Sequence, residues 1–164
     1  MTGVLVAVNV VHKLIRGPTR WTAIDKRPVD GPVSVGVLGL DGDRQCDTRY
    51  HGGPDKALYA YAAEDAEWWA AELGREIPPG LFGENLTTRG LDITGAGIGE
   101  RWRIGEVLVE VRSPRTPCGN LSGRMGIKRF HQRFARVGRV GVYLKVLQTG
   151  VVQAGDPIRL DASA

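Results

Sequence analysis

The chain of 164 residues contains two cysteines and no long apolar run. Cys46 and Cys118 allow at most one disulfide, and without a Cys-x-x-Cys pair or a further Cys/His cluster the sequence does not favour a zinc or iron–sulfur site. No apolar stretch approaches the roughly 20 residues that span a bilayer, and no charged and then apolar leader precedes the first predicted strand. These absences predict a cytoplasmic protein that does not insert into a membrane.

Several common functional motifs are missing as well. There is no Walker loop, no G-x-G-x-x-G that opens a helix after a strand and no H-E-x-x-H. Repeats, low-complexity tails and linkers are also absent, so we expect a single domain over residues 1–164. A formal net charge of +4 favours anionic partners in general. The charge alone leaves nucleic acid, a phosphate-bearing cofactor and an acidic electron donor open.

Glycine and β-branched residues are abundant and predict a mainly β fold. The chain has 23 glycines, about twice the usual share near 7%. Val4–Val11 and Val107–Val111 have the composition and alternation of strands, whereas Glu64–Leu73 predicts a helix that Gly74 ends. Ile127–Val137 places apolar residues at helical spacing, with basic residues mostly outward. Together these segments predict a β-barrel with a few peripheral helices.

Cys118 carries the candidate reactive atom. The predicted strand before it stops at two prolines, which cannot donate to a sheet ladder, and Gly119–Arg124 permits a short helix after it. A helix N-terminus and nearby cations favour thiolate over thiol. The cations close in sequence are Arg112, Arg115 and Arg124. Free cysteines are usually small buried hydrophobes, so the residues alone leave both an activated thiolate and a packing cysteine open.

Two other polar segments carry candidate binding residues. His12–Pro32 is a long irregular basic stretch that includes Lys26, and it is either a solvated loop or an arm that binds a phosphate. Arg44 and His51 lie around a turn in which Gly52 and Gly53 allow the backbone to pass close to a ligand. A structural histidine with glycines that serve only the turn is the alternative.

Five segments, taken in order, resemble the MOSC domain family, which is named after the C-terminal domain of molybdenum cofactor sulfurase, and within it the small bacterial YiiM-type proteins. They are Thr22–Val29, Gly39–Gln45, His51–Ala57, Phe82–Thr87 and Ser113–Cys118, and the resemblance spans nearly the whole chain. It implies a MOSC-type β-barrel that binds a molybdopterin-type molybdenum cofactor. It also implies reduction of N-hydroxylated compounds, such as 6-N-hydroxylaminopurine-like bases, hydroxylamines and amidoximes.

The resemblance further implies roles for individual residues. Cys118 matches the cysteine that binds molybdenum, and His51 would bind or protonate the N–OH group of the substrate. The pterin and its phosphate would be held by Lys26, Arg44, Asn85 and Arg115. For Asn85, capping of its own backbone is the simpler alternative. Because few large aromatic residues surround Cys118, we expect a shallow site with a broad substrate range.

Partners and competing roles follow from the same residues. No flavin, haem or iron–sulfur motif is present, so we expect a separate reductase that supplies the electrons. We expect no nucleic acid as a partner. Two other roles would also use Cys118: a sulfur carrier with a persulfide on this residue, and a protein that binds or stores the cofactor without turnover. Cys46 stands where YiiM-type proteins more commonly have alanine, so we expect no catalytic role for it. Monomer and homodimer remain open.

Overall fold

The computed structural model describes residues 2–18, 20–45 and 52–161. The candidate residue His51 and the second cysteine, Cys46, lie outside these ranges. Within them, no helix combines the length and the apolar character needed to cross a membrane.

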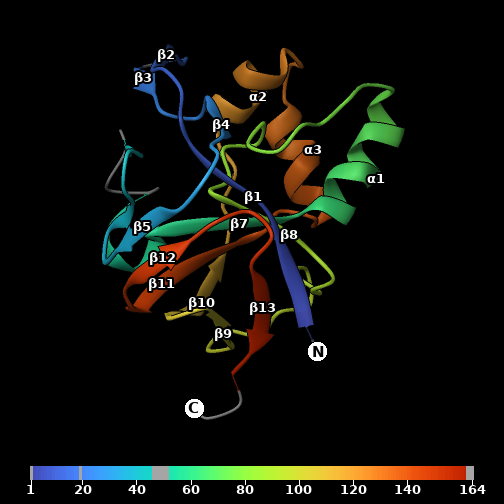
Figure 1. The fold of residues 1–164 in the computed structure, drawn as a ribbon. Helices are drawn as coiled ribbons and strands as arrows, with labels where there is room; N and C mark the ends of the chain where they lie inside the picture. Colours follow the sequence, from blue (N-terminus) through green and yellow to red (C-terminus); the bar gives the residue numbers. More distant parts are fainter. Residues whose placement is uncertain (1, 19, 46–51, 162–164) are drawn as a thin grey trace.

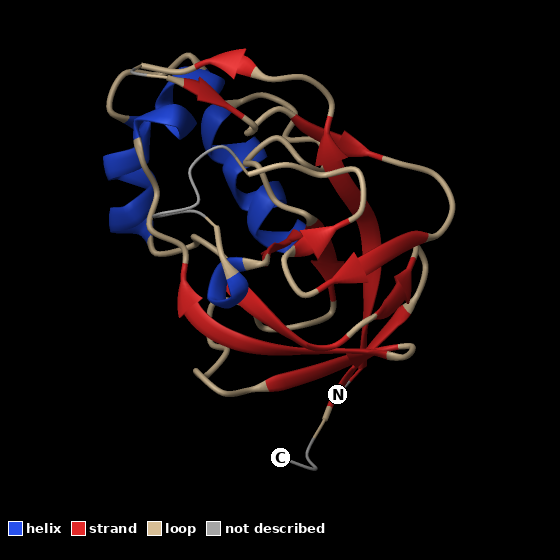
Figure 2. Ribbon diagram, turned by 90° about the vertical axis from the view of Figure 1, so that its left-hand side faces the viewer, coloured by secondary structure: helices blue, strands red, loops and turns tan. Residues whose placement is uncertain are grey.

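Seven of the described strands form a closed barrel (Figures 1 and 2). Around the ring these are β13 (Pro157–Leu160), β9 (Arg101–Ile104), β10 (Val107–Pro114), β11 (Val142–Gln148), β7 (Leu58–Ala62), β8 (Leu86–Arg89) and β1 (Thr2–Val11), and β13 pairs with β1 to close it. Neighbouring strands are antiparallel except β7 and β8. Closure leaves the ring without a free edge, and it confirms the predicted β-barrel.

Short strands extend the barrel on the side of the candidate site. β4 (Lys26–Pro28) pairs with the end of β1, and β2 (Ile15–Arg16) forms a small hairpin with β3 (Trp21–Thr22). The basic stretch His12–Pro32 is therefore less irregular than predicted, because it contains three short strands. A separate three-stranded sheet is formed by β5 (Val33–Gly36), β6 (Gly39–Leu40) and β12 (Gly150–Val152).

Three α-helices of the described chain lie together on one side of the barrel, as Figure 2 shows. α1 (Ala63–Leu73) connects the parallel strands β7 and β8, which need such a crossover. Gly74 ends it in the left-handed conformation, as predicted. α2 is Gly119–Met125, and α3 (Phe130–Val137) begins later than predicted because Arg129 before it adopts a left-handed conformation with φ 61°. A 3-10 turn, η1, covers Pro54–Lys56.

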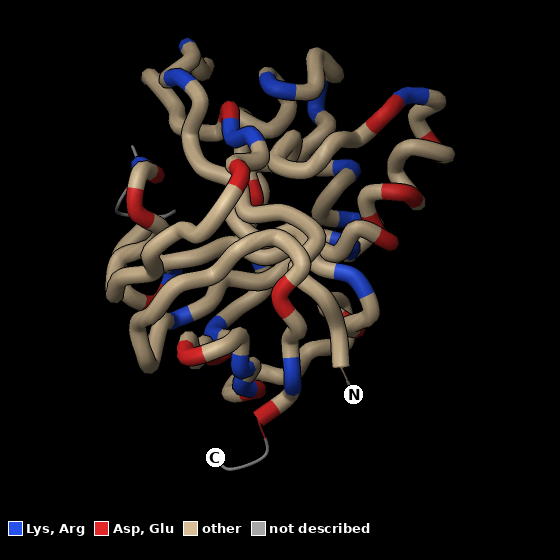
Figure 3. Tube along the Cα trace, viewed as in Figure 1, with Lys and Arg blue, Asp and Glu red and all other residues tan. Residues whose placement is uncertain are grey.

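Opposite charges join the helices. α1 carries several acidic residues along its length, and α3 carries basic residues (Figure 3). Arg133 on α3 pairs with Glu72 at 3.0 Å, and Arg139 just after α3 pairs with Asp65 at 2.7 Å. Part of the basic character of this segment is thus directed at α1.

Two apolar cores support the fold. One fills the barrel with aliphatic residues and Trp102. The other is an aromatic layer between the barrel wall and the helices, in which Tyr61, Trp69, Phe82 and Phe134 are fully buried. Trp69 stacks on Phe134 with ring centroids 5.6 Å apart. This layer fixes the helices on the wall that carries β7 and β11.

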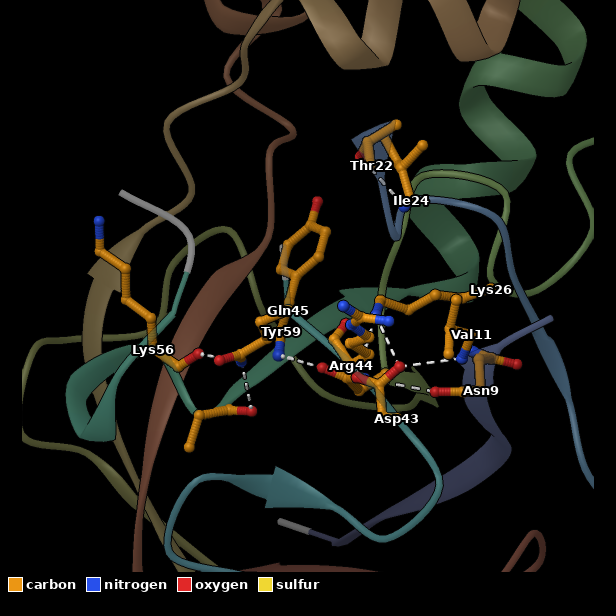
Figure 4. A network of polar contacts seen from close by, with 12 residues as sticks. Asn9, Val11, Thr22, Ile24, Lys26, Asp43, Arg44, Gln45, Lys56 and Tyr59 are labelled. Atoms are coloured by element: carbon orange, nitrogen blue, oxygen red, sulfur yellow. Dashed lines mark hydrogen bonds and ion pairs between the residues drawn. The ribbon is translucent and has the colours of Figure 1, made fainter. Parts of the chain in front are cut away.

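The carboxylate of Asp43 ties the segment after β6 to the barrel. It accepts hydrogen bonds from the backbone N–H of Val11 at 2.9 Å and from Asn85 Nδ2 at 2.8 Å, and it pairs with Lys26 Nζ at 2.7 Å. Figure 4 shows Asp43 between Lys26 and Val11. The side chains of Lys26 and Asp43 are almost completely buried. We call Asp43, Val11, Lys26 and Asn85 the Asp43 network.

Removal of this carboxylate should destabilise the protein strongly. Asp43→Ala leaves a buried lysine cation without its partner, and loss of one member of a buried pair costs about 3–5 kcal/mol. Asp41→Ala, two residues away and exposed, is the matched control and should change stability by no more than about 0.5 kcal/mol. Urea unfolding of both variants measures the difference. Equal midpoints would show that the network does not hold the segment.

Candidate functional site

Cys118 lines a cavity at the end of the barrel from which the arm with β2, β3 and β4 extends. The cavity is open to solvent, and the space in it that water-sized molecules can enter is about 90 Å³. Segments far apart in the sequence meet there. The lining residues are Arg20, Trp21, Thr22, Ala23, Ile24, Lys26, Asp43, Arg44, Gln45, Lys56, Tyr59, Gly83, Asn85, Arg115, Cys118, Asn120 and Tyr143.

Five of the six candidate residues lie in the described part of the chain, and the structure brings all five to this one cavity. Lys26, Arg44, Asn85 and Arg115 all line it together with the cysteine. The sixth candidate, His51, lies outside the described residues. The grouping arises because β4, the segment after β6, the turn before β8 and the exit from β10 all end on the same side of the barrel.

Cys118 stands between a strand and a helix. β10 ends at Pro114, and Cys118 is the residue before α2, in an extended conformation with φ −132° and ψ 178°. The sequence predicted the short helix, whereas the strand runs three residues further than the predicted Val107–Val111. Cys118 is a free, half-buried cysteine and is absent from both apolar cores. Its thiol therefore faces a cavity, which differs from the environment of a packing cysteine.

Arg115 is the buried cation of the site. Its side chain donates to Phe82 O at 2.6 Å and to Tyr59 Oη at 3.1 Å, and its guanidinium carbon lies 4.6 Å from the centroid of the Tyr59 ring. Among residues 2–18, 20–45 and 52–161, no carboxylate forms an ion pair with Arg115. A buried guanidinium without a counter-ion suits the binding of an anion.

The electrostatics of Arg115 involve the cysteine. Burial lowers the pKa of the Arg115 guanidinium, but Tyr59, Tyr143 and Cys118 act in the opposite direction, and the pKa is raised overall. Burial also raises the pKa of Tyr59, despite the nearby guanidinium, so this phenol stays neutral and donates to Val140 O at 2.5 Å. Arg115 is thus held charged, in one orientation, beside the thiol.

Lys26 and Asn85 are already engaged within the protein. Lys26 Nζ contacts both Asp43 carboxylate oxygens, at 2.7 and 3.0 Å, so its charge is matched by a carboxylate. Asn85 accepts from the Tyr59 N–H at 3.1 Å and donates to Asp43 Oδ2 and to Asn9 O. Both amide hydrogens of Asn85 are used, so a pterin would have to replace one of these bonds or bind the free lone pair of its oxygen.

Glu84 lies behind the cavity wall, between the lining residues Gly83 and Asn85. Its Oε2 accepts from Thr87 Oγ1 at 3.0 Å, and Thr87 Oγ1 accepts from Asn9 Nδ2 at 3.0 Å. Burial raises the pKa of Glu84, which favours the neutral carboxyl. Asp43 is therefore the carboxylate that lines the cavity, against several cations.

Several lining residues were not predicted. Trp21, Tyr59 and Tyr143 place three aromatic side chains in the cavity, whereas the sequence suggested few aromatic residues around Cys118. Gln45 fixes the segment after Asp43, because its Nε2 donates to Lys56 O at 3.1 Å (Figure 4). These residues are far from Cys118 in the sequence, so their place in the cavity could not be predicted from the segment around the cysteine. Only Trp21, a large aromatic residue inside a basic stretch, carries a local signal.

The cavity suits an anionic organic cofactor better than a bare metal ion. Its cations are Arg20, Lys26, Arg44, Lys56 and Arg115. In the part of the chain that the structure describes, no group of three or more His, Cys, Asp or Glu residues could hold a metal. The described residues alone would leave a metal at Cys118 short of protein ligands, as suits a metal that is held within an organic cofactor. The residues present thus fit a molybdopterin-type group.

Comparisons with known proteins show which family the chain is related to. The MOSC domain family model matches residues 47–159. The Escherichia coli (strain K12) protein YiiM is 38% identical over 143 residues, which are 85% of this chain and 63% of YiiM. A Gibberella moniliformis protein named "Reductase" is 35% identical over 164 residues, or 96% of this chain and 29% of that protein. The chain thus spans less than two thirds of the length of these relatives.

The fold gives the same result. The crystal structure of YiiM from Geobacillus stearothermophilus superposes with a TM-score of 0.80 at 34% identity, over 97% of this chain and 75% of that one. The family match covers more than half of the chain, and the similarity of the fold agrees with it. The protein therefore belongs to the MOSC domain family.

Proposed function

We propose that the protein is a molybdenum cofactor-dependent reductase of N-hydroxylated compounds, with Cys118 as the protein ligand to molybdenum. The observation that carries the proposal is a half-buried thiol in the same cation-rich cavity as a buried guanidinium, that of Arg115, which forms no ion pair with the described residues. Membership of the MOSC family supports a function related to the molybdenum cofactor, and the relative named "Reductase" supports oxidoreductase activity.

In this proposal Cys118 supplies a soft thiolate ligand, which suits molybdenum better than a hydroxyl does. The cofactor, when bound, supplies the two-electron redox chemistry. In the overall reaction the N–O bond of the substrate breaks, two electrons and two protons are taken up, and an amine and water form. The role of the chain is to bind and orient both molecules.

Arg115 would bind an anionic or carbonyl edge of the cofactor. Its orientation is set by Phe82 O and Tyr59 Oη and by the face of the Tyr59 ring, so little order is lost when it binds. Arg44, exposed at the cavity rim, would add positive charge toward the phosphate, and Lys26 would contact the cofactor as part of its ion pair with Asp43. Asn85 would offer the pterin its remaining oxygen lone pair while it holds Asp43.

His51 stays the candidate that binds or protonates the N–OH group. The electrons would come from a separate reductase, since the chain has no flavin or haem motif. A sulfur carrier with a Cys118 persulfide is the second candidate, because the same cavity-facing thiol would serve it. A protein that stores the cofactor without turnover is the third.

Replacement of the cysteine tests the metal ligand. Cys118→Ser should remove molybdenum from protein made in a host that supplies the cofactor, because serine forms no alkoxide at neutral pH where cysteine forms a thiolate. Cys46→Ser is the matched control and should retain the metal. Elemental analysis measures both, and near-stoichiometric molybdenum in Cys118→Ser would contradict the assignment. Persulfide without molybdenum in the wild-type protein would support the sulfur carrier.

Replacement of the buried arginine tests the anion site. Arg115→Gln should weaken cofactor binding by about 1–3 kcal/mol, the range for a charge-assisted hydrogen bond. Arg115→Lys keeps the charge but lacks the planar guanidinium, so its cofactor affinity should lie between those of wild type and Arg115→Gln. Arg136→Gln, an exposed arginine in the last turn of α3, is the control and should bind normally. The readout is pterin content after purification at raised salt. Wild-type content in Arg115→Gln would exclude Arg115 from the cofactor site.

The activity itself has a direct test. Molybdenum-loaded protein with a chemical reductant should convert 6-N-hydroxylaminopurine, or a simple amidoxime, to the amine. Chromatography follows the product, and protein without cofactor is the control. If no amine forms from any N-hydroxylated compound although the metal is present and reduced, the reductase proposal is wrong, and the carrier and storage roles remain.

A further inference from the structure

Trp21 is an exposed indole in the wall of the cysteine cavity. Of the four tryptophans, Trp69 and Trp102 are fully buried and Trp68 packs against the aromatic layer, whereas Trp21 is 55% exposed. Single exposed apolar side chains are common on protein surfaces. Trp21 differs from them because it lines the same cavity as Cys118.

The hairpin that carries Trp21 is held against the start of α2. A Cβ atom at Gly17, in the tip of the hairpin, would overlap the side chain of Asn120, and one at Gly119 would lie 3.5 Å from Pro18 Cγ. Backbone and proline ring therefore approach the two residues that follow Cys118. After the hairpin, the Thr22 hydroxyl accepts from the Ile24 N–H at 3.2 Å and fixes the chain. These contacts keep the indole at the edge of the site.

The other aromatic rings of the cavity are less available to a ligand. Tyr59 and Tyr143 are 6% and 4% exposed. A cation already lies over each ring, Arg115 at 4.6 Å from the Tyr59 centroid and Lys56 at 5.2 Å from that of Tyr143. Over Trp21 the Arg16 guanidinium lies farther away, at 6.0 Å, near the limit of a cation–π contact. Trp21 thus offers the largest accessible aromatic surface of the cavity.

We infer that Trp21 forms a stacking subsite for the planar ring of an aromatic substrate, with Arg16 supporting the indole. The inference rests on the proposed reductase function. A tryptophan binds aromatic rings of many kinds, because stacking needs a flat π face and no particular hydrogen-bond pattern. Trp21 therefore makes the enzyme prefer N-hydroxylated purines and aryl compounds to small aliphatic ones, while the range among aromatic substrates stays broad.

Two substrates that share the N–OH group, one with an aromatic ring and one without, distinguish a stacking role of Trp21 from a general role in supporting the site. Molybdenum-loaded wild type, Trp21→Ala and Trp21→Tyr are assayed with a chemical reductant on 6-N-hydroxylaminopurine and on acetamidoxime. In Trp21→Ala the KM for the purine should rise about 5- to 10-fold, the lower part of the range for one stacked base, while its kcat and the KM for acetamidoxime stay unchanged. Trp21→Tyr should restore most of the loss. Leu38→Ala, 64% exposed and outside the cavity, should change nothing.

Other outcomes overturn the inference. Equal KM increases for both substrates would assign Trp21 to the support of the site. Loss of turnover with a protein reductase but not with the chemical reductant would assign it to docking of the electron donor.

Failure of the subsite and failure of the reductase proposal are distinguishable. If wild type reduces neither compound, the proposed function fails, but the subsite is still tested by equilibrium dialysis of the loaded protein with adenine, the planar product of 6-N-hydroxylaminopurine. Adenine should bind about 5-fold or more weakly to Trp21→Ala than to wild type. Equal affinities would overturn the stacking subsite.

Discussion

The carboxylate of Asp43 is the interaction on which the architecture of the cavity depends. It satisfies one strand end through the Val11 N–H, one cation on β4 through Lys26 and one amide before β8 through Asn85. Asn85 in turn fixes the start of β7 through the Tyr59 N–H at 3.1 Å. Because fully satisfied buried networks resist distortion, one acid holds three walls of the site at fixed distances. A loop that would otherwise be free becomes part of the barrel end.

The aromatic layer extends this order to the other side of the cavity. The Arg115 guanidinium lies 5.9 Å from the centroid of Phe134, which stacks on Trp69 in α1. Phe82, whose carbonyl accepts from Arg115, packs edge-on against Phe134 at 5.1 Å. Helices that do not line the cavity therefore position its buried cation through ring contacts.

Local patterns made much of the fold predictable, and distant contacts limited the rest. The strand at Val107, the helix that Gly74 ends and the turn of structure after Cys118 each follow from residues within one segment. Asp43, the partner of both Lys26 and Asn85, lies 17 residues from the first and 42 from the second. Neither the ion pair nor the hydrogen bond of the Asn85 side chain therefore has a local sequence pattern. The predicted start of α3 at Ile127 is wrong because Arg129 adopts a left-handed conformation, which is uncommon for residues other than glycine and so could not be predicted from its type.

The two buried cations of the cavity, Lys26 and Arg115, differ in their partners, and this difference bears on what binds there. Lys26 is neutralised by Asp43 at 2.7 Å, so its charge contributes to the structure before any ligand arrives. Arg115 is buried to a similar degree, but its contacts among the described residues are a carbonyl, a phenol and ring faces, with no ion pair. Such dipoles hold a guanidinium without cancelling its charge, and an anion that enters regains the attraction that a carboxylate would have supplied. Of the two buried cations that the sequence predicted, Lys26 and Arg115, Arg115 is therefore the one whose charge the fold leaves for a ligand beside Cys118.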